Sequence, residues 1–244
     1  MAKKAIPLSD LPVVSSSSFD FSSDIFTSGA VVLMDKPLTW SSFDVVRYVR
    51  NRVPPKKVGH AGTLDPLATG LLILCTGKAT RTISEIQVQP KVYETTIKFG
   101  ESTPSYDTAL DPDATAEWTH IDRQIIEAVL QSQFSGTILQ TPPIYSAIQV
   151  DGERLYKKAR RGEKLTPPPR QVTIHKIEII NCSMPELQLR IHCGKGTYIR
   201  SIAHDLGLAL DSLAHVTALR RTSIGEFSVD KALLPKELDQ LLII

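Results

Sequence analysis

The stretch KVGHAGTLDPLATG, Lys57–Gly70, decides how the rest of the chain is interpreted. Three glycines interrupt it, and Asp65 stands between Leu64 and Pro66. It runs directly into LLILC, residues 71–75, which is apolar enough to form a buried strand. A carboxylate in a loop shaped by Gly and Pro is a candidate reactive group, because a fixed loop can aim it. An Asp before Pro is equally typical of an ordinary turn, so both interpretations stand at this point.

The bulk composition allows a sizeable core and leaves the partner open. The chain has 244 residues, of which 42% are hydrophobic, and it can form one large domain or two lobes. Its net charge is only +2, but the charges are segregated: Glu101–Glu127 holds seven acids and one base, and Ala147–Arg170 holds seven bases and three acids. The second segment predicts a basic face suited to phosphate, although a lone cluster of this kind often only solubilises a helix.

The cysteines and the apolar runs predict a cytoplasmic protein that does not enter a membrane. Cys75, Cys182 and Cys193 lie far apart without a CxxC pair, and two of them fall in apolar runs, where a cysteine is usually a small buried hydrophobe. No apolar run approaches the ~20 residues that cross a bilayer. The N-terminus has Lys3-Lys4 but no apolar segment of a secretory signal after it.

Hydrophobic periodicity predicts an α+β fold with many strands that need not be parallel. Residues 1–28 are rich in serine and predict a flexible N-terminal tail, docked at most through its scattered phenylalanines. Strands are expected at residues 30–34, 71–75, 92–99, 172–180 and 187–193, with strand ends at 218–221 and 226–229. Helices are expected from Phe43 to before Pro54, over 78–86, after Asp122, over 154–161, from about residue 200 and over 235–242, with a hairpin turn at 151–152.

The sequence lacks the patterns that are typical of several other kinds of catalytic site. No histidine pair has the spacing of a metal site, no P-loop or GxSxG elbow is present, and a glycosidase would need a second carboxylate in a comparable loop. Asp65 remains as a possible nucleophile. Tyr93 and Tyr198 stand where an aromatic ring could stack on an unpaired base, although each is equally suited to core packing. The histidines considered as metal ligands are the six in the chain: His60, His120, His175, His192, His204 and His215.

Four stretches of the chain resemble the TruB family of tRNA pseudouridine synthases. Residues 59–70 are similar to the catalytic motif of that family over their whole length. The similar stretches follow one another in family order from about residue 29 to about residue 229, so the resemblance covers most of the chain. The others are Leu33–Pro37 with Ser41-Ser42, Lys195–Arg200 with Asp205-Leu206-Gly207, and His215-Val216 with Leu219-Arg220-Arg221.

The resemblance implies a pseudouridine synthase fold, with a mixed, largely antiparallel sheet, flanking helices and a central RNA-binding cleft. It implies a catalytic domain over residues 29–244, with an insertion at about 142–171 that clamps the T arm of tRNA. Many members continue beyond this point into a small RNA-binding PUA domain, which we do not expect here. The implied reaction is isomerisation of the uridine at position 55 in the T loop to pseudouridine, on a nucleotide flipped out of its stack.

The resemblance also implies roles for single residues. Asp65 would be the essential aspartate that acts on the flipped nucleotide. The six others are His60, which helps to hold the flipped RNA; Tyr93, which stacks on the target base; Tyr198, which lies in the pocket; Arg200, which pairs with Asp65 and keeps it ionised; Leu219, an apolar pocket residue; and Lys36, which supports the catalytic loop.

The implied partners are few. No cofactor and no metal are expected, and the T-arm stem-loop of tRNA is the expected partner of a monomer without an obligatory protein partner. Residues 102–108, STPSYDT, depart from the corresponding family segment, so no contacts are assigned to them. The alternative function is a non-catalytic RNA-binding or tRNA-folding protein that uses the same cleft.

Overall fold

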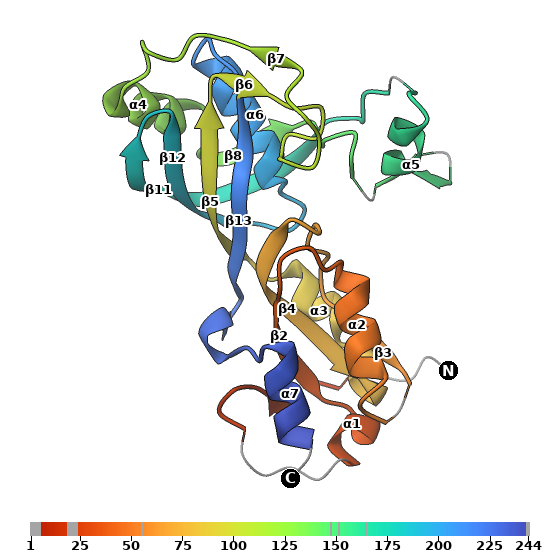
Figure 1. Cartoon of the computed structure of the whole chain (residues 1–244). Coiled ribbons are helices and arrows are strands. Elements are labelled where there is room, and N and C mark those ends of the chain that lie inside the picture. The colour runs from red at the N-terminus through yellow and green to blue at the C-terminus, as the bar shows by residue number, and fades with distance from the viewer. Residues whose placement is uncertain are drawn as a thin grey trace. The chain divides into compact units, whose positions relative to one another are not determined.

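The computed structural model describes residues 6–18, 24–54, 56–146, 148–150, 152–163 and 165–242. The chain forms two compact units (Figure 1). Unit 1 comprises residues 1–92 and 220–244, and unit 2 comprises residues 93–219. The catalytic domain expected over 29–244 therefore contains all of unit 2 and most of unit 1. No helix among the described residues is both long and apolar enough to span a membrane.

Unit 1 is built on short helices and a mixed sheet. Its elements are η1 (Leu8–Asp10), β1 (Val13–Val14), α1 (Asp24–Ser28), β2 (Val31–Lys36), α2 (Ser42–Arg50), β3 (Val58–His60), β4 (Ala68–Thr76), η2 (Gly77–Arg81), α3 (Ile83–Val88), β14 (Phe227–Ser228), η3 (Val229–Lys231) and α7 (Pro235–Leu242). Strands β5 (Lys91–Phe99) and β13 (Ala214–Ile224) each contain a boundary between the units.

Strand β4 is the centre of the sheet in unit 1. It pairs antiparallel with β2, from Val31 opposite Cys75 to Lys36 opposite Gly70. Its other edge carries β3, which is antiparallel to it, and the last residues of β13. On the far side of β2, β1 runs parallel to that strand. The strand predicted over residues 71–75 is confirmed as the middle of β4.

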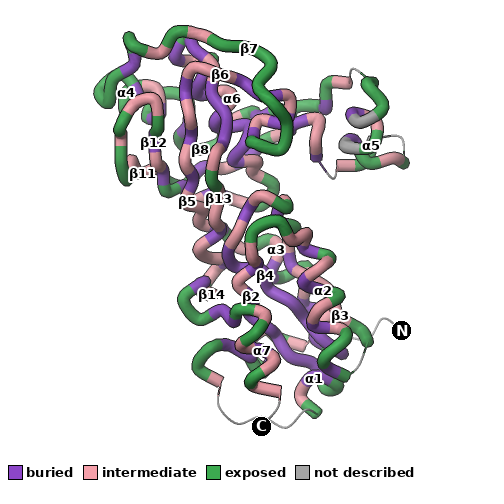
Figure 2. The backbone as a smooth tube through the Cα atoms, in the orientation of Figure 1, coloured by how far each residue is buried: buried purple, intermediate pink, exposed green. Residues whose placement is uncertain are grey.

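Strands β2 and β4 are buried along most of their length (Figure 2). Their alternate residues pack on opposite faces of the sheet. One face packs against α1, α2 and α7, and the other against η2 and α3. The first face consists of Val32, Met34, Leu72 and Leu74 with Phe26, Val45, Val46, Val49 and Leu238; the second consists of Val31, Leu33, Leu71, Ile73 and Cys75 with Leu11, Ala79, Ile86 and Ile224. Cys75 is a buried hydrophobe as predicted, and burial raises the pKa of its thiol to about 12.

The described part of the predicted tail is packed against unit 1. Residues 6–18 contribute β1 to the sheet, and α1 inserts Phe26 into the core. The sequence allowed this tail to dock through its phenylalanines, and Phe26 does so. Val14 adds further apolar surface that the sheet buries. Phe19 and Phe21 lie outside the described residues.

Unit 2 contains five strands of the large sheet with helices packed on them, and two further sheets of two strands each, β6 (Glu101–Ser102) with β7 (Ala114–Thr115) and β9 (Gln149–Val150) with β10 (Glu153–Arg154). Within this unit the strand order is β13-β5-β12-β11-β8, where β8 is Gly136–Gln140, β11 is Arg170–Ser183 and β12 is Glu186–Cys193. Strand β11 is antiparallel to both β12 and β8. The predicted α+β fold with a largely antiparallel sheet is confirmed. The helices of this unit are α4 (Arg123–Gln133), α5 (Leu155–Arg160) and α6 (Ile199–Ala209).

One face of the sheet in unit 2 forms the core with α4 and α6. Alternate residues of β12 and β5 are buried there, whereas Arg190 and Glu94 on the other face are exposed and paired at 2.7 Å. The core includes Ile97, Phe99, Leu187, Leu189, Ile191 and Cys193 from strands, and Ile126, Leu130, Ile202 and Leu206 from helices. The basic segment between β8 and β11 carries the β9–β10 hairpin and α5, both of which the sequence predicted (Figure 1).

Most predicted helices are present, with local differences. The helix expected over residues 78–86 is broken into η2 and α3. The strand end expected at 218–221 is part of the eleven-residue strand β13, whose polar residues interrupt the alternation that marks a strand. Helix α2 begins after Ser41, whose side chain accepts from Asp44 N while Asp44 accepts from Ser41 N, which is a complete capping box.

Phe26→Ala should show whether α1 belongs to the core. Phe26 is 0% exposed, and the truncation should lower the free energy of unfolding by about 3–5 kcal/mol, because it leaves a cavity. Phe43, which is 59% exposed in the same unit, is the matched control. Phe43→Ala should change the free energy of unfolding by less than about 0.5 kcal/mol. Chemical denaturation measures both. Equal effects of the two truncations would contradict this packing.

Candidate active site

Asp65 lies in the loop that connects β3 to β4 in unit 1. The loop leaves β3 with Ala61 N donating to Ile73 O at 2.8 Å, and it ends in a turn where Ala68 N donates to Asp65 O at 3.0 Å. Asp65 itself is half-buried. The sequence offered an ordinary turn as the alternative to a catalytic role for Asp65. That turn is present, and the Asp65 carboxylate projects from it.

Lys36 supports this loop from the end of β2. Its side chain is completely buried, and its Nζ donates to Pro66 O at 3.2 Å, Pro37 O at 2.9 Å and Trp40 O at 2.6 Å. Three carbonyl oxygens thus satisfy the three N–H donors of the ammonium group. Burial lowers the pKa of Lys36 to about 8, and the negative charge of Asp65 acts in the opposite direction.

Ser42 joins the loop to helix α2. Its buried Oγ accepts from Leu64 N at 2.8 Å and donates to Leu64 O at 3.0 Å. Both backbone groups of the residue before Asp65 are satisfied by one hydroxyl at the first turn of α2. Thr39 N adds a bond to Pro66 O at 2.9 Å, from a residue with a φ of 71°.

Arg221 holds the other side of the loop from β13. Its side chain is 1% exposed, and its guanidinium donates to Leu71 O at 2.8 Å, Gly62 O at 3.1 Å and Thr63 O at 3.4 Å. Its neighbour Arg220 instead forms a two-pronged pair with Asp35, at 2.6 and 3.0 Å. The sequence identified Arg220 and Arg221 only as part of the family resemblance, without a role for either.

Gly70 makes the close approach of β4 and β13 possible. Its φ is +101°, and a Cβ built on it would lie 2.3 Å from Arg221 O and 2.8 Å from Arg221 N. No side chain fits between the two strands at this point. Since Arg221 also bonds to Gly62 and Thr63 in the loop and to Leu71 in β4, this glycine keeps the loop and its buried arginine in register.

His60 is the last residue of β3, at the entrance to the loop. Burial lowers the pKa of its imidazole, and the positive charge of Arg221 acts in the same direction. His60 is therefore neutral near pH 7. A neutral ring can contact a base or sugar without the desolvation cost of a charge.

Arg200 lies at the start of α6 in unit 2 and is held by a loop. It is 4% exposed; its Nη1 donates to Ser105 O at 2.8 Å and its Nη2 to Tyr145 O at 3.0 Å. Nη1 also lies 3.5 Å from Asp107 Oδ2, an ion pair that is almost fully buried. The segment to which the sequence assigned no contacts, residues 102–108, therefore provides two of the groups around Arg200.

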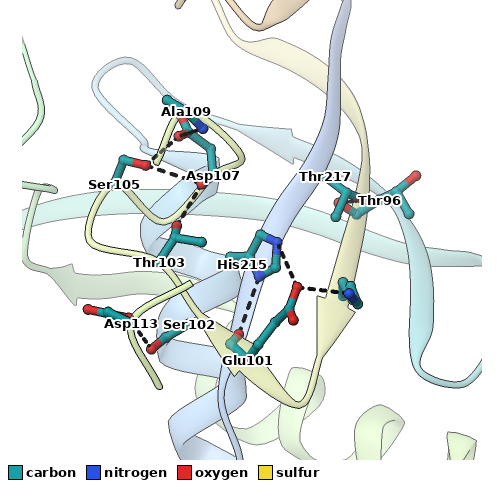
Figure 3. Close-up of polar contacts among 11 residues, drawn as sticks. Thr96, Glu101, Ser102, Thr103, Ser105, Asp107, Ala109, Asp113, His215 and Thr217 are labelled. Carbon is teal, nitrogen blue, oxygen red and sulfur yellow. Dashed lines mark hydrogen bonds and ion pairs between the residues drawn. The ribbon is translucent and has the colours of Figure 1, made fainter. Parts of the chain in front are cut away.

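The loop around Asp107 is cross-linked by short side chains (Figure 3). Ser105 Oγ donates to Asp107 Oδ1 at 2.6 Å, and Thr103 Oγ1 donates to Asp107 O at 2.6 Å. Ala109 N donates to the same carboxylate oxygen as Ser105, at 3.0 Å. Asp107 thus organises its own loop with one oxygen and faces Arg200 with the other. The sequence missed it because an Asp in a polar, acidic stretch has no distinguishing pattern.

A second polar group secures the beginning of this loop (Figure 3). The buried His215 of β13 has Nδ1 3.3 Å from Glu101 O and Nε2 3.7 Å from Glu101 Oε1. Lys98 Nζ lies 2.8 Å from the same carboxylate oxygen. These contacts attach β6 to β13 and β5 before the chain enters the loop.

The remaining predicted site residues also lie in unit 2. Tyr198 precedes α6, and its backbone N–H and C=O are both bonded to the buried Gln140, at 2.8 and 3.0 Å. The guanidinium of Arg170 stands over its ring at 4.7 Å. Tyr93 on β5 and Leu219 on β13 are half-buried and pack against the core of unit 2. Within unit 1 the structure brings together Lys36 and the Asp65 loop, with His60 at its entrance.

Metal ligation finds no support in the described part of the chain. No group of three or more His, Cys, Asp or Glu side chains with the geometry to hold a metal ion occurs there. Around the Asp65 loop, the backbone carbonyls are instead bonded to the cationic side chains of Lys36 and Arg221.

Comparisons with known proteins agree over most of the chain. Residues 50–199 match the TruB family pseudouridylate synthase N-terminal domain, and residues 200–243 match the tRNA pseudouridylate synthase B C-terminal domain. A tRNA pseudouridine synthase B of Parabacteroides distasonis is 46% identical, over 89% of this chain and 94% of its own. One of Flavobacterium johnsoniae is 50% identical, over 85% and 93%.

A solved structure supports the same assignment at the level of the fold. A chain from a crystal structure of a Cbf5-Nop10-Gar1 complex has a TM-score of 0.69 and 25% identity; the match covers 93% of this chain and 60% of that one. Fold and matches together define the class of the protein, the pseudouridylate synthases. Within that class, the chain belongs to the TruB family.

Gly70→Ala should be far more damaging than an alanine at another glycine of positive φ. Gly136 has a φ of +73°, and a Cβ added there would meet no atom within 4 Å, so Gly136→Ala should cost only about 1–2 kcal/mol of stability. Gly70→Ala adds overlap with the backbone of Arg221 and should cost at least about 3 kcal/mol. Chemical denaturation of both variants measures the difference, and equal costs would contradict the close approach of the strands.

The buried ammonium of Lys36 should appear in the pH dependence of stability. Because its pKa falls from 10.5 to about 8 on folding, the unfolded state binds more protons between these values. The free energy of unfolding should therefore rise with pH in this window, by up to about 1.4 kcal/mol per pH unit, relative to Lys36→Met. Denaturation of both proteins from pH 7 to 10 measures this. A constant difference between them would show that Lys36 does not change its pKa on folding.

Proposed function

We propose that this chain isomerises uridine to pseudouridine in tRNA, at position 55 of the T loop. The observation that carries the proposal is the Asp65 loop, in which a carboxylate stands on a backbone held by Lys36, Ser42 and Arg221. Membership of the TruB family and the names of the relatives support the reaction and the tRNA substrate. A rigid loop of this kind suits a nucleophile, because it holds the reacting oxygen in place without further reorganisation.

The reaction rearranges one nucleotide and consumes nothing. The Asp65 carboxylate acts as a nucleophile and forms a bond to the flipped-out uridine, and the glycosidic C1′–N1 bond breaks. The uracil then turns so that C5 faces the sugar, and a C5–C1′ bond forms. The bond to Asp65 breaks and frees the carboxylate, the proton on C5 leaves, and N1 gains one. Substrate and product have the same atoms, so no redox partner or group donor enters the balance. The carboxylate must be ionised when it attacks, which nearby cationic groups favour.

The other proposed site residues act on the same nucleotide. In unit 1, His60 shapes the flipped RNA with a neutral ring, and Lys36 supports the loop. In unit 2, Tyr93 stacks on the target base, Tyr198 lies against it, and Leu219 supplies an apolar wall. Arg200 supplies a positive charge that acts on the target nucleotide, and the buried setting of its guanidinium in unit 2 suits such a role.

The segment of residues 142–171 is proposed to clamp the T arm of tRNA. Arg154 and Lys157 are exposed there. Arg161 is also exposed, but it is paired with Glu153 at 2.6 Å and Glu163 at 2.7 Å, so its charge is compensated within the segment itself. Phosphate contacts by the exposed bases make RNA binding weaken with salt. We further propose that the protein acts as a monomer in the cytoplasm, without an obligatory protein partner.

Asp65→Asn separates chemistry from binding. The purified wild-type protein, incubated with an unmodified tRNA transcript, should place pseudouridine at position 55 alone, as read by chemical mapping. Asp65→Asn keeps the shape of the loop but removes the nucleophilic charge, and should lower the rate by at least about 10³-fold while RNA affinity changes little. Asp122→Asn, at the exposed cap of α4, is the control and should retain the wild-type rate.

The outcomes distinguish the candidate functions. A wild-type protein that binds tRNA but forms no pseudouridine would contradict the enzyme and leave the non-catalytic RNA-binding or tRNA-folding function. Product from Asp65→Asn at the wild-type rate would contradict Asp65 as the nucleophile. Pseudouridine at another position would contradict the T loop as the target.

A further inference from the structure

An aromatic stack ties the loop of residues 102–109 to helix α6 in unit 2. The ring of Tyr106 lies on the ring of His204, with centroids 3.9 Å apart and planes 9° from parallel. Tyr106 stands between Ser105 and Asp107, two of the residues that contact Arg200. The stack therefore sits at the centre of the segment that surrounds that guanidinium.

The backbone of Tyr106 is held in an unusual conformation. Its φ is 62°, in the left-handed region that disfavours a side chain by roughly 1–2 kcal/mol. Its N–H donates to Thr103 O at 3.1 Å, and its C=O accepts from Val216 N at 3.0 Å, so the turn is bonded on both sides. A glycine would adopt this turn at no steric cost. The presence of a large aromatic residue here points to a task for its ring.

His204 is placed to receive that ring. It follows Arg200 by four residues on α6, so both side chains project from the same face of the helix. Its Nδ1 is buried and has no hydrogen-bond partner among the described residues. The ring of His204 instead contacts the ring of Tyr106 through its face. Burial lowers the pKa of His204, and its ring is therefore uncharged near neutral pH. Helix α6 thus contacts one loop twice, through Arg200 and through His204.

We infer that Tyr106 and His204 are positioning residues, which hold the 102–109 loop on α6 so that Ser105 O and Asp107 fix the guanidinium of Arg200. The inference rests on the proposed function, in which Arg200 acts on the target nucleotide. Arg200 Nη1 bonds to a carbonyl only one residue from the stacked ring. A loop that lifts from α6 takes this acceptor and the carboxylate of Asp107 with it. The guanidinium then loses its fixed orientation while the rest of the core remains.

Tyr106→Gly is the variant that isolates the ring. It removes the stack but relieves the left-handed backbone, so the fold should not suffer from the substitution itself. His204→Ala removes the other half of the stack, and Tyr106→Phe retains it without the hydroxyl. Leu208→Ala, one turn further along α6 at a 52% exposed position, is the control for a truncation on this helix. Tyr106→Asn, which also tolerates the turn, replaces Tyr106→Gly if the latter does not fold.

Single-turnover rates, tRNA affinity and unfolding midpoints test the inference together. Tyr106→Gly and His204→Ala should each lower the rate about tenfold or more, because the guanidinium is no longer held in place, with tRNA affinity unchanged within about twofold. The double variant should be no slower than the slower single variant, since both remove one contact. Tyr106→Phe and Leu208→Ala should match the wild type.

Several results would overturn this inference. They are a wild-type rate in Tyr106→Gly, a loss in Tyr106→Phe equal to that in Tyr106→Gly, effects that multiply in the double variant, or rate losses that merely follow a lowered unfolding midpoint. An inactive wild type would instead contradict the proposed function. A crystal structure of Tyr106→Gly then decides the inference without activity: Ser105 O should have left hydrogen-bond distance of Arg200 Nη1, and an unchanged contact would refute it.

Discussion

Buried cations bonded to backbone carbonyls hold the Asp65 loop in unit 1. Lys36 from β2 donates to the carbonyls of Pro37, Trp40 and Pro66, and Arg221 from β13 donates to those of Gly62, Thr63 and Leu71. A loop cannot bury its carbonyls without donors, and a buried cation cannot stay charged cheaply without acceptors. Each therefore satisfies the other, and the loop has one arrangement.

The rest of unit 1 can be understood as support for this arrangement. The two-faced packing of β2 and β4 fixes the strand that carries Lys36, and the absence of a side chain at Gly70 lets β13 bring Arg221 against β4. The capped start of α2 places Ser42 on Leu64. Unit 2 uses a related device, since Arg200 is buried against loop carbonyls and Asp107. In both units a cation organises irregular backbone.

Much of this could be predicted from sequence, because it rests on local patterns. The apolar run after Gly70 marks β4, the two serines before Phe43 mark the start of α2, and Asp122 marks the start of α4. The candidate nucleophile stood out because glycines and a proline frame it. The resemblance to the TruB family supplied its proposed partners, and the comparisons confirm the family.

The remainder depends on contacts that no local pattern encodes. Arg221 follows another arginine in a polar stretch, and only the approach of β13 to β4 makes one of the two buried while the other pairs with Asp35. Phe26 lies in a serine-rich region, yet the sheet buries it. Asp107 and Tyr106 belong to a segment without periodicity, and their roles depend on α6, about 95 residues later in the chain. Long-range burial decides all of these cases.

If the buried cations keep the Asp65 loop in place for the chemical step, weakening their bonds should slow the reaction and leave tRNA affinity nearly unchanged. Arg221→Lys tests this most directly. A lysine keeps the charge but cannot reach three separate carbonyls with a planar fork. Single-turnover pseudouridine formation and tRNA affinity should be measured on the same folded protein. We expect a rate at least about tenfold lower with nearly unchanged affinity. A wild-type rate, or a loss confined to affinity, would contradict this role of the buried cations.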